Sequence, residues 1–286
     1  MQFERKLKGM KKFKLLALFT ALILVFTGCS AVKTNEDKKA SEDNAATDTS
    51  WDYIKENGKI IVGLDDTFAP MGFRDEAGKL VGFDIDLAEA VGEKLGVKIE
   101  LQSIDWDAKE LELSNKKIDV IWNGMSKTPE RIEKMTLSNP YLQNAIVIMT
   151  KKGSDIKKKD DIIGKKIGIQ VDSAALEVVQ GDEIYDKIEN DITEYKNYDE
   201  ACMELETGRV DAVIIDKILG MYKATIKADT YEFADEDFGP DLFVVGMRKE
   251  DKAFAQELQK AMDALKADGT ALKISEKWFS EDLIVK

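Results

Sequence analysis

Apolar runs of strand length alternate with amphipathic stretches along most of the chain. Residues 59–64 (KIIVGL) form a short apolar run, which favours a buried strand. The stretch 83–96 (FDIDLAEAVGEKLG) repeats apolar residues at helical spacing and ends in glycine, as helices commonly do. Residues 97–103 (VKIELQS) alternate apolar and polar side chains, which predicts a half-buried strand. The pattern therefore begins as strand, helix, strand.

The same alternation continues into the second half of the chain. It predicts further strands at 118–122, 165–170 and 210–216, and further helices near 106–113, after Pro129, and from Ser173, Tyr198 and Lys217. Strands that alternate with helices are typical of mainly parallel sheets flanked by helices. The expected fold class is therefore α/β.

Two short segments of the chain resemble each other. KKIDVIWNG (116–124) and GRVDAVIID (208–216) align with Asp119 on Asp211, which places Gly124 on Asp216. Each of these two positions stands at the carboxyl end of a predicted strand, where open parallel sheets bind their ligands. The similarity between the two segments is short, but it indicates two related lobes.

Two further apolar runs, from Ala145 and from Leu242, bracket the second half of the chain. A chain that leaves one lobe through the first run and returns through the second has a paired hinge, with a cleft between the lobes. We expect lobe 1 at 51–145 and 242–286, lobe 2 at 146–241, and hinge strands at about 146–150 and 242–246.

The N-terminus has the features of an export signal. A basic stretch precedes the apolar run 15–27, which is shorter than the roughly 20 residues that span a bilayer. The sequence VFTGCS resembles the lipobox of bacterial lipoproteins, although Phe26 replaces the usual leucine. We expect a signal peptide at 1–28 and lipidation of Cys29, with a free thiol after an ordinary signal peptide as the alternative. Residues 29–50 have few large apolar side chains, which favours a flexible tether.

Composition excludes several classes of function. The 286 residues carry a formal net charge of −13 and include no histidine. The first 28 residues hold six basic and one acidic residue, so the remainder carries 36 basic and 54 acidic residues. Such an acidic surface repels phosphate backbones, so no nucleic-acid partner is expected. Without histidine there is no His-based triad, imidazole base or His-ligated zinc. Cys202, in a helical pattern, is expected to be a small buried residue.

The segment NGMSKTPER (123–131) carries the clearest chemical signal. Thr128 is a good helix cap, Pro129 a favoured first helical residue, and Glu130 suits the positive end of the helix dipole. Arg131 then stands in the first turn, where a cation gains nothing from the dipole. A bound carboxylate would explain it, since a guanidinium offers two parallel donors. A surface ion pair with a neighbouring acid is the alternative.

Acidic and aromatic residues follow other predicted strands. Asp216 ends an apolar strand, where an unpaired carboxylate would be costly to bury unless a cation met it. Asp65, Asp66 and Phe68 follow the first strand, and Trp106 follows another acid. Carboxylates, aromatic faces and one arginine together suit a zwitterion, such as an amino acid. Taken singly, phenylalanine and tryptophan at positions such as Phe68 and Trp106 are more often core residues.

Four segments together resemble the signatures of extracytoplasmic solute-binding proteins for polar amino acids, which serve ABC importers. They are GLDDTFAPMGFRDEAGKLVGFDIDLAEAVGEKLG, IDWDAKELELSNKKIDVIWNGMSKTPERIEKMTLSNPYLQ, GKKIGIQVDSAALE and GRVDAVIIDK. The resemblance covers nearly the whole chain after Trp51. It implies a two-lobed, hinge-closing fold that takes one amino acid in its cleft.

The resemblance also implies roles for individual residues. Arg131 would hold the α-carboxylate, with the backbone at Ser126 and Ala174. The Gly124 carbonyl, the Ser126 hydroxyl and Asp216 would hold the α-ammonium group. The side-chain pocket would be lined by Asp65, Phe68, Trp106, Asn123 and Gln170.

Departures from the family pattern leave the substrate open. Asp172 stands where many relatives have a small Gly-Ser/Thr turn, and Trp122 is bulkier than usual. The acids near the pocket argue against aspartate and glutamate as ligands. They permit a cationic side chain or a polar neutral one, and the tryptophans favour the latter, with cystine and glutamine as candidates.

The resulting hypothesis is a monomeric, lipid-anchored receptor on the extracytoplasmic face of the membrane. It would deliver a polar L-amino acid to an ABC permease without catalysis, cofactor or metal. Two other classes remain open. One is a ligand-sensing receptor for a separate signalling partner. The other is a dehydratase-like enzyme on the same fold, with Asp65 and Asp216 as acid and base.

Overall fold

The computed structural model describes residues 48–285. The predicted signal peptide, Cys29 and most of the predicted tether therefore lie outside the described residues. Within residues 48–285, no helix combines the length and the apolar character needed to cross a bilayer.

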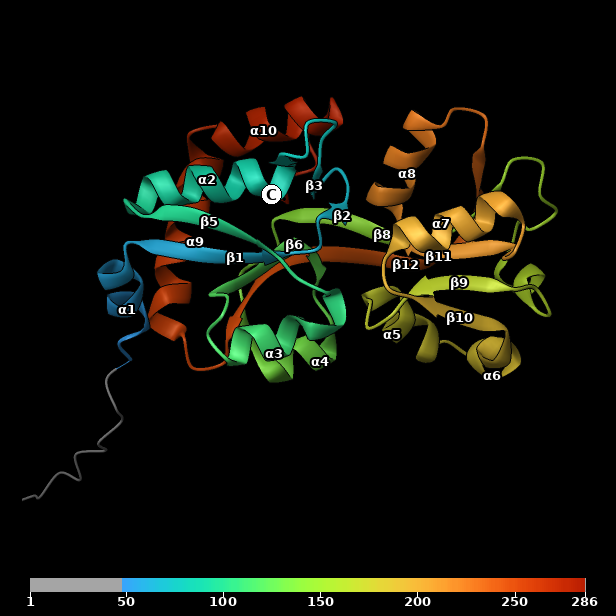
Figure 1. The fold of residues 1–286 in the computed structure, drawn as a ribbon, viewed down its shortest axis with the longest axis horizontal. Helices are drawn as coiled ribbons and strands as arrows, with labels where there is room; N and C mark the ends of the chain where they lie inside the picture. Colours follow the sequence, from blue (N-terminus) through green and yellow to red (C-terminus); the bar gives the residue numbers. More distant parts are fainter. Residues whose placement is uncertain (1–47, 286) are drawn as a thin grey trace, which may run out of the picture. The chain divides into compact units, whose positions relative to one another are not determined.

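A nine-stranded sheet forms the centre of the fold (Figure 1). Its strands are β1 (Lys59–Leu64), β5 (Lys98–Ser103), β6 (Val120–Ser126), β7 (Met135–Leu137), β8 (Leu142–Lys151), β9 (Ile167–Gln170), β10 (Ile192–Tyr195), β11 (Ala212–Asp216) and β12 (Tyr231–Arg248). They lie in the order β10-β9-β11-β8-β12-β6-β1-β5, and β7 pairs with β12.

The sheet consists of two parallel groups joined by an antiparallel pair. Strand β1 pairs in parallel with β5 and β6, and β9 pairs in parallel with β10 and β11. Strands β8 and β12 are antiparallel to each other and to the strands that flank them. In Figure 1 these two long strands cross between the two groups. The predicted α/β class, with parallel sheets and two connecting strands, is confirmed.

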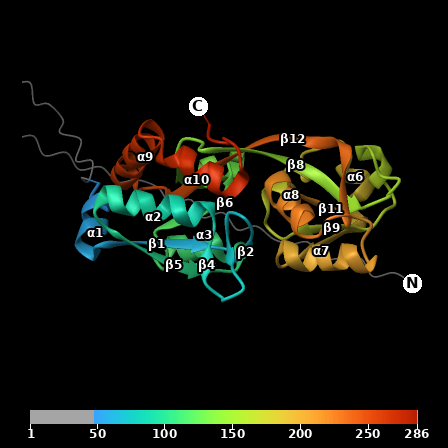
Figure 2. The same cartoon turned by 90° about the horizontal axis from the view of Figure 1, so that it is seen from above.

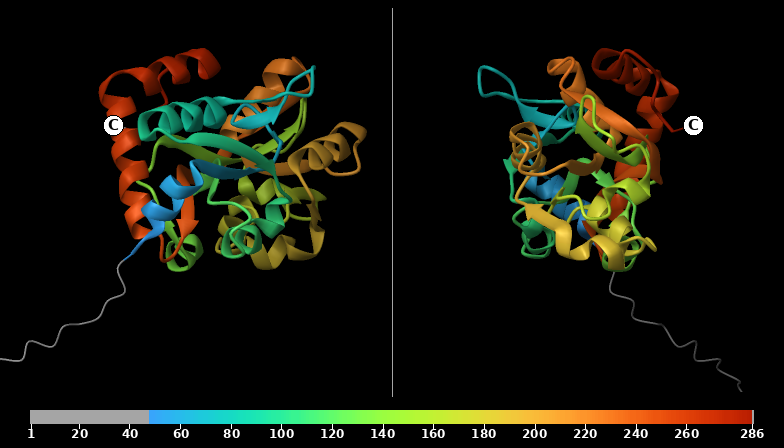
Figure 3. Two further views of the ribbon diagram at one scale, coloured as in Figure 1. Left: turned by 60° about the vertical axis from the view of Figure 1, so that its left-hand side comes forward. Right: turned by 90° about the vertical axis from the view of Figure 1, so that its right-hand side faces the viewer.

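Helices flank both parallel groups. They are α1 (Ser50–Asn57), α2 (Phe83–Leu95), α3 (Lys109–Ser114), α4 (Pro129–Lys134), α5 (Ala174–Gln180), α6 (Tyr185–Ile188), α7 (Tyr198–Thr207), α8 (Lys217–Ile226), α9 (Lys252–Ala267) and α10 (Thr270–Phe279), with short 3-10 turns at η1 (Trp106–Ala108), η2 (Lys159–Ile162) and η3 (Glu189–Asp191). Helices α2, α9 and α10 pack together although α9 and α10 come from the C-terminus (Figures 2 and 3). A separate small sheet contains β2 (Thr67–Phe68), β3 (Gly72–Arg74) and β4 (Leu80–Val81).

Several predicted elements occur where the sequence indicated them, and two differ. The first strand has the predicted bounds, and Gly96 ends α2 in the left-handed conformation with φ 71°. The strand predicted to end at Trp122 instead runs to Ser126, because Met125 and Ser126 still pair with β12. The predicted helix 106–113 begins as a 3-10 turn and continues as α3.

The two aligned segments make the same local contacts. The Asp119 side chain accepts the Ile61 backbone N–H at 2.9 Å, and Asp119 N–H donates to the Ile61 carbonyl at 2.8 Å. Asp211 forms the same pair of bonds with Lys166, at 2.8 and 2.7 Å. Each aspartate thus fixes a central strand, β6 or β11, to its parallel neighbour.

The connecting strands are longer than the predicted segments at 146–150 and 242–246. Residue Asn144 of β8 lies opposite Asp241 of β12 in the antiparallel register. Polar side chains therefore sit at the centre of the connection, just outside the apolar runs that the sequence displays. Cys202 is 3% exposed, and burial raises the pKa of its thiol to about 12, as expected for a residue without chemistry.

Candidate functional site

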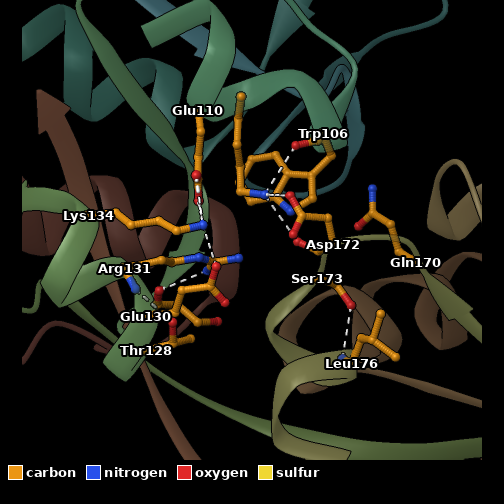
Figure 4. Close-up of polar contacts among 12 residues, drawn as sticks. Trp106, Glu110, Thr128, Glu130, Arg131, Lys134, Gln170, Asp172, Ser173 and Leu176 are labelled. Atoms are coloured by element: carbon orange, nitrogen blue, oxygen red, sulfur yellow. Dashed lines mark hydrogen bonds and ion pairs between the residues drawn. The ribbon is translucent and has the colours of Figure 1, made fainter. Parts of the chain in front are cut away.

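Arg131 lies in the first turn of α4, beyond the carboxyl end of β6. The Thr128 hydroxyl caps the helix by accepting the Arg131 backbone N–H at 3.3 Å. The guanidinium donates to the Ser126 carbonyl oxygen at 2.9 Å and lies 5.8 Å from the centre of the Trp106 ring (Figure 4).

The environment of Arg131 is not that of a surface ion pair. The residue is 4% exposed, and burial lowers the pKa of its guanidinium. Within residues 48–285 no carboxylate lies at ion-pair distance from it, while its neighbour Glu130 pairs with Lys134. A buried guanidinium with unused donors remains available for an anionic ligand.

Asp216 ends β11 and is 5% exposed. Its carboxylate accepts the Asn144 side-chain amide at 2.7 Å, and no lysine or arginine of the described residues pairs with it. Burial and then the negative charge of Asp241 raise the pKa of Asp216 to about 8. The site therefore contains a buried acid that lacks a positive partner.

Asp241, on β12, is a site residue that the sequence analysis missed. Its carboxylate accepts the Ser126 hydroxyl at 2.6 Å and the Asn144 amide at 2.9 Å. The one available signal was an acid directly before the apolar run of a predicted hinge strand. Ser126 and Asp216, which the sequence analysis proposed for the same ammonium group, are thus connected through Asp241 and Asn144.

Asp65 and Gln170 meet although they are more than a hundred positions apart. The Gln170 amide donates to one Asp65 oxygen at 2.9 Å, and the other oxygen accepts the Thr67 N–H and hydroxyl at 2.9 and 2.7 Å. Burial raises the pKa of the Asp65 carboxyl. Both oxygens of this acid are therefore already bonded by uncharged donors.

Phe68, Gly124 and Tyr198 form a packed group beside the charged residues. The Phe68 and Tyr198 rings are 6.2 Å apart and tilted by 56°. Gly124 has φ 55°, and a Cβ atom there would lie 2.8 Å from the Phe68 ring, so only glycine fits without a shift. Tyr198, which the sequence analysis did not single out, is 1% exposed, and its hydroxyl has no hydrogen-bond partner among residues 48–285.

Lys109 is a second cation that the sequence analysis missed. Its ammonium group donates to the carbonyl oxygens of Trp106 and Asp172, at 3.3 and 3.1 Å, and pairs with the Asp172 carboxylate (Figure 4). Burial, and then the charge of Arg131, lower the pKa of Lys109. A lysine in an amphipathic helical pattern gives no sequence signal of burial, which explains the omission.

The sequence left open whether Asp172 lies in the pocket or only in a turn. It adopts φ 53°, a left-handed turn conformation that aspartate tolerates. It also lines a cavity of about 70 Å³ together with Lys109, Arg131 and Ser173. The residue therefore adopts a turn conformation and also lies beside the same small cavity as Arg131.

The other predicted residues occupy supporting positions. The Asn123 side chain accepts the Asp65 backbone N–H at 3.1 Å and lies beside Gly72. Trp122 packs in the core with its ring 6.3 Å from that of Tyr141. Ala174 is the first residue of α5, whose cap Ser173 accepts the Leu176 N–H at 3.2 Å.

Two α/β lobes joined by two long strands define a two-lobed solute-binding protein. In the part of the chain that the structure describes, a cation just beyond β6 and an acid at the end of β11 have no oppositely charged partner. The chain matches the model of the bacterial extracellular solute-binding proteins, family 3, over residues 60–281, and it belongs to that family.

Individual relatives cover most of the chain. The chain is 32% identical over 238 residues to the L-cystine-binding protein TcyJ of Escherichia coli (strain K12), which covers 80% of this chain and 86% of that protein. It is 31% identical over 282 residues to the L-cystine-binding protein TcyA of Bacillus subtilis (strain 168), and the match covers 96% of this chain and 99% of that protein. A crystal structure of an ABC uptake transporter substrate-binding protein from Streptococcus pneumoniae with bound histidine matches with a TM-score of 0.79 and 37% identity, over 84% of this chain and 99% of that chain.

Proposed function

We propose that the protein is a receptor that binds a polar L-amino acid in the cleft between its lobes and delivers it to an ABC import permease. The observation that carries this proposal is a pair of buried groups, the Arg131 guanidinium and the Asp216 carboxyl, neither of which has an oppositely charged partner among residues 48–285. An α-amino acid is a zwitterion and supplies the opposite charge to each of them. Membership of the solute-binding family supports binding rather than turnover as the activity.

The resemblance to the solute-binding family implies the role that we propose for each residue. Arg131 holds the α-carboxylate, and the backbone at Ser126 and Ala174 adds donors. Asp216, the Ser126 hydroxyl and the Gly124 carbonyl hold the α-ammonium group. The ligand side chain lies in a pocket that involves Asp65, Phe68, Trp106, Asn123 and Gln170.

The energetics of such a site are sufficient for a receptor. Micromolar affinity corresponds to about −8.2 kcal/mol. Hydrogen bonds to charged groups contribute roughly 1.5–3 kcal/mol each, so a few of them, with stacking on aromatic rings, reach this value after the costs of association. No covalent or acid–base step is needed.

For the ligand side chain, we propose a polar uncharged group or cystine. Asp65 is already bonded by Gln170 and Thr67, and Asp172 by Lys109, so neither acid is reserved for a cationic side chain. The two cystine-binding relatives support cystine within this class. Glutamine is the alternative of the same class.

We also propose that Cys29 is lipidated and anchors a monomeric receptor to the extracytoplasmic face of the membrane. The lipobox-like VFTGCS sequence supports the anchor. The family of extracellular solute-binding proteins supports the location. A tether of about twenty residues would leave the folded body free to reach a permease.

A thermal-shift screen tests the proposed function. The soluble body, Ser30 to Lys286, is unfolded and refolded to remove carried-over ligand, then melted with each of the twenty L-amino acids, cystine, ornithine and citrulline. We expect a selective rise in Tm for cystine or glutamine, because a ligand that binds only the folded state stabilises it. A rise for arginine or lysine alone would contradict the proposed side-chain class. No shift for any compound would contradict amino-acid binding itself.

A further inference from the structure

The two hinge strands carry a pair of polar residues that face each other across the sheet. Asn144 of β8 lies opposite Asp241 of β12. The Asn144 side-chain oxygen Oδ1 accepts the Ile218 backbone N–H at 3.3 Å, which leaves the two side-chain N–H donors of Asn144 for acids. These donate to Asp216 at 2.7 Å and to Asp241 at 2.9 Å. The side-chain amide thus bridges two carboxylates.

Asp241 also contacts β6, a strand of the first parallel group. The Ser126 hydroxyl, at the end of β6, donates to the Asp241 carboxylate at 2.6 Å. A continuous chain of hydrogen bonds therefore runs from Ser126 through Asp241 and Asn144 to Asp216. It begins on a strand of the first parallel group, crosses both hinge strands and ends on a strand of the second group.

We propose that Asp241 is a positioning residue that sets the Ser126 hydroxyl and, through Asn144, the Asp216 carboxylate for the substrate's ammonium group, and thereby links occupation of the site to the hinge. This inference rests on the proposed amino-acid binding. Asp241 acts through its neighbours rather than by touching the substrate. Its own bonds to Ser126 and Asn144 change when the hinge strands move relative to β6 and β11.

The charges around Asp216 support this role. Asp241 faces it from β12, Arg131 from α4, the neutral amide of Asn144 from β8 and the neutral Tyr198 hydroxyl from α7. Two acids thus face one guanidinium, which the substrate carboxylate would engage. The substrate ammonium supplies the missing positive charge, so its arrival favours the ionised form of Asp216.

A proton balance follows from this arrangement. Burial and the charge of Asp241 raise the pKa of Asp216 to about 8, so most of the free protein holds a proton on Asp216 at pH 7. Binding an ammonium group favours the ionised carboxylate, so the proton leaves. Affinity should therefore rise from pH 6 to pH 8, by up to about tenfold per unit, and then level off.

Titration calorimetry on the full chain in detergent, with L-cystine and L-glutamine as probes, tests the proposal. Heats in buffers of different ionisation enthalpy give the protons released at pH 7. We expect close to one proton for wild type. For Asp241→Asn we expect at least a tenfold loss of affinity at pH 8 and a smaller proton release at pH 7, since Asp216 then ionises at lower pH.

Asn144→Ala is the second variant, because it removes the bridge but keeps both acids. The Asn144 hydrogen bond lowers the pKa of Asp216, so its loss should raise that pKa. Affinity should then be weaker, and its rise should occur at higher pH. Asp241→Asn should shift the rise to lower pH. Asp237→Asn, an exposed acid on the same strand, is the matched control and should behave as wild type. Melting curves verify that each variant is folded.

Wild-type affinity and wild-type proton release in Asp241→Asn would overturn the proposal. A shift in the pH dependence of affinity in the same direction in Asp241→Asn and Asn144→Ala would also overturn it. If wild type bound neither probe nor any other amino acid, the proposed function itself would fail, and this inference with it. The two failures are distinguishable because only the first leaves wild-type binding intact.

Discussion

Arg131 and Asp216 are ionisable side chains that the fold buries without an oppositely charged partner among residues 48–285. Burying an ionised group costs several kcal/mol of desolvation unless an opposite charge and hydrogen bonds offset it. Arg248, by contrast, is equally buried but pairs with Asp119 at 3.2 Å and Asp251 at 2.7 Å. Arg248 thus belongs to a structural ion cluster, whereas Arg131 and Asp216 have no such partner among residues 48–285, as we expect of groups that bind a ligand.

Gly124 offers a prediction at the residue scale. Replacement by alanine combines a left-handed backbone, which costs an L-residue about 1–2 kcal/mol, with a clash 2.8 Å from the Phe68 ring. Gly124→Ala should therefore lower the free energy of unfolding by about 2–4 kcal/mol and weaken ligand binding. Urea denaturation monitored by tryptophan fluorescence measures the first effect.

Gly96→Ala is the control for that substitution. Gly96 also has a positive φ, of 71°, but a Cβ atom there meets nothing within 4 Å. The free energy of unfolding of Gly96→Ala should therefore fall only by the cost of the left-handed backbone, about 1–2 kcal/mol, and ligand affinity should be unchanged. Equal losses in the two variants would show that contact with Phe68 does not explain the glycine at position 124.

Residue types at strand ends were predictable because glycine, arginine and aspartate stand out beside apolar runs. All four of the predicted residues Arg131, Asp216, Asp65 and Gln170 are buried, and Asp65 and Gln170 meet in a hydrogen bond. Tyr198 and Lys109 were not predictable, because a tyrosine or lysine in a helical pattern has no signal that distinguishes burial from exposure. Their environment depends on elements from the other lobe, which no local pattern specifies.

At the scale of elements, Asp84 connects α2 to β6. Its carboxylate accepts the Gly124 backbone N–H at 2.6 Å and the Tyr141 hydroxyl at 2.8 Å. The acid lies in the first turn of α2, where the helix dipole favours a negative charge, yet burial raises its pKa to about 7. A buried acid thus holds the strand that carries Gly124 and Ser126.

This shift predicts how stability depends on pH. The ordinary pKa of an aspartate is near 3.8, so between pH 4 and 7 the folded protein holds a proton on Asp84 that the unfolded chain releases. Stability should therefore fall as pH rises through this window, with this one group contributing up to about 1.4 kcal/mol per pH unit. Guanidinium denaturation at pH 5, 6, 7 and 8 measures the slope.

Asp84→Asn supplies the comparison, because asparagine does not titrate. The pH dependence of its unfolding free energy should be flatter than that of wild type from pH 5 to 7, while Asp216 still contributes in both proteins. Identical slopes would mean that folding does not change the proton affinity of Asp84.

Element lengths show where the sequence pattern is insufficient. Strand β1 and helix α2 were predictable because their periodicity and the terminal glycine agree. The hinge strand β12 runs from Tyr231 to Arg248, far beyond its apolar run, since pairing with β8 includes polar residues that face solvent or the site. Asp241 was missed for this reason: its role depends on a strand partner almost a hundred residues away.

At the scale of the whole molecule, polar contacts join parts of the chain that belong to different parallel groups. Asp65 meets Gln170 and Lys109 meets Asp172, so residues near the ends of β1 and β9 and from α3 are tied together around the site. The sequence indicated two related lobes through Asp119 and Asp211, and these residues make equivalent bonds. The sequence did not indicate which side chains of the two parallel groups meet, because these contacts depend on how the two groups are placed in the fold.

The central claim is that one amino acid lies between Arg131 and Asp216, and calorimetric titration of Arg131→Ala tests it most directly. The ligand is the compound that stabilises wild type most in the thermal screen. We predict at least a hundredfold loss of affinity, because one residue supplies the bidentate carboxylate contact. The free variant should lose at most about 2 kcal/mol of stability, since within residues 48–285 Arg131 makes no ion pair and one side-chain hydrogen bond. Arg209→Ala, an exposed arginine paired with Glu204, is the control and should bind as wild type does. Wild-type affinity in Arg131→Ala would contradict the account.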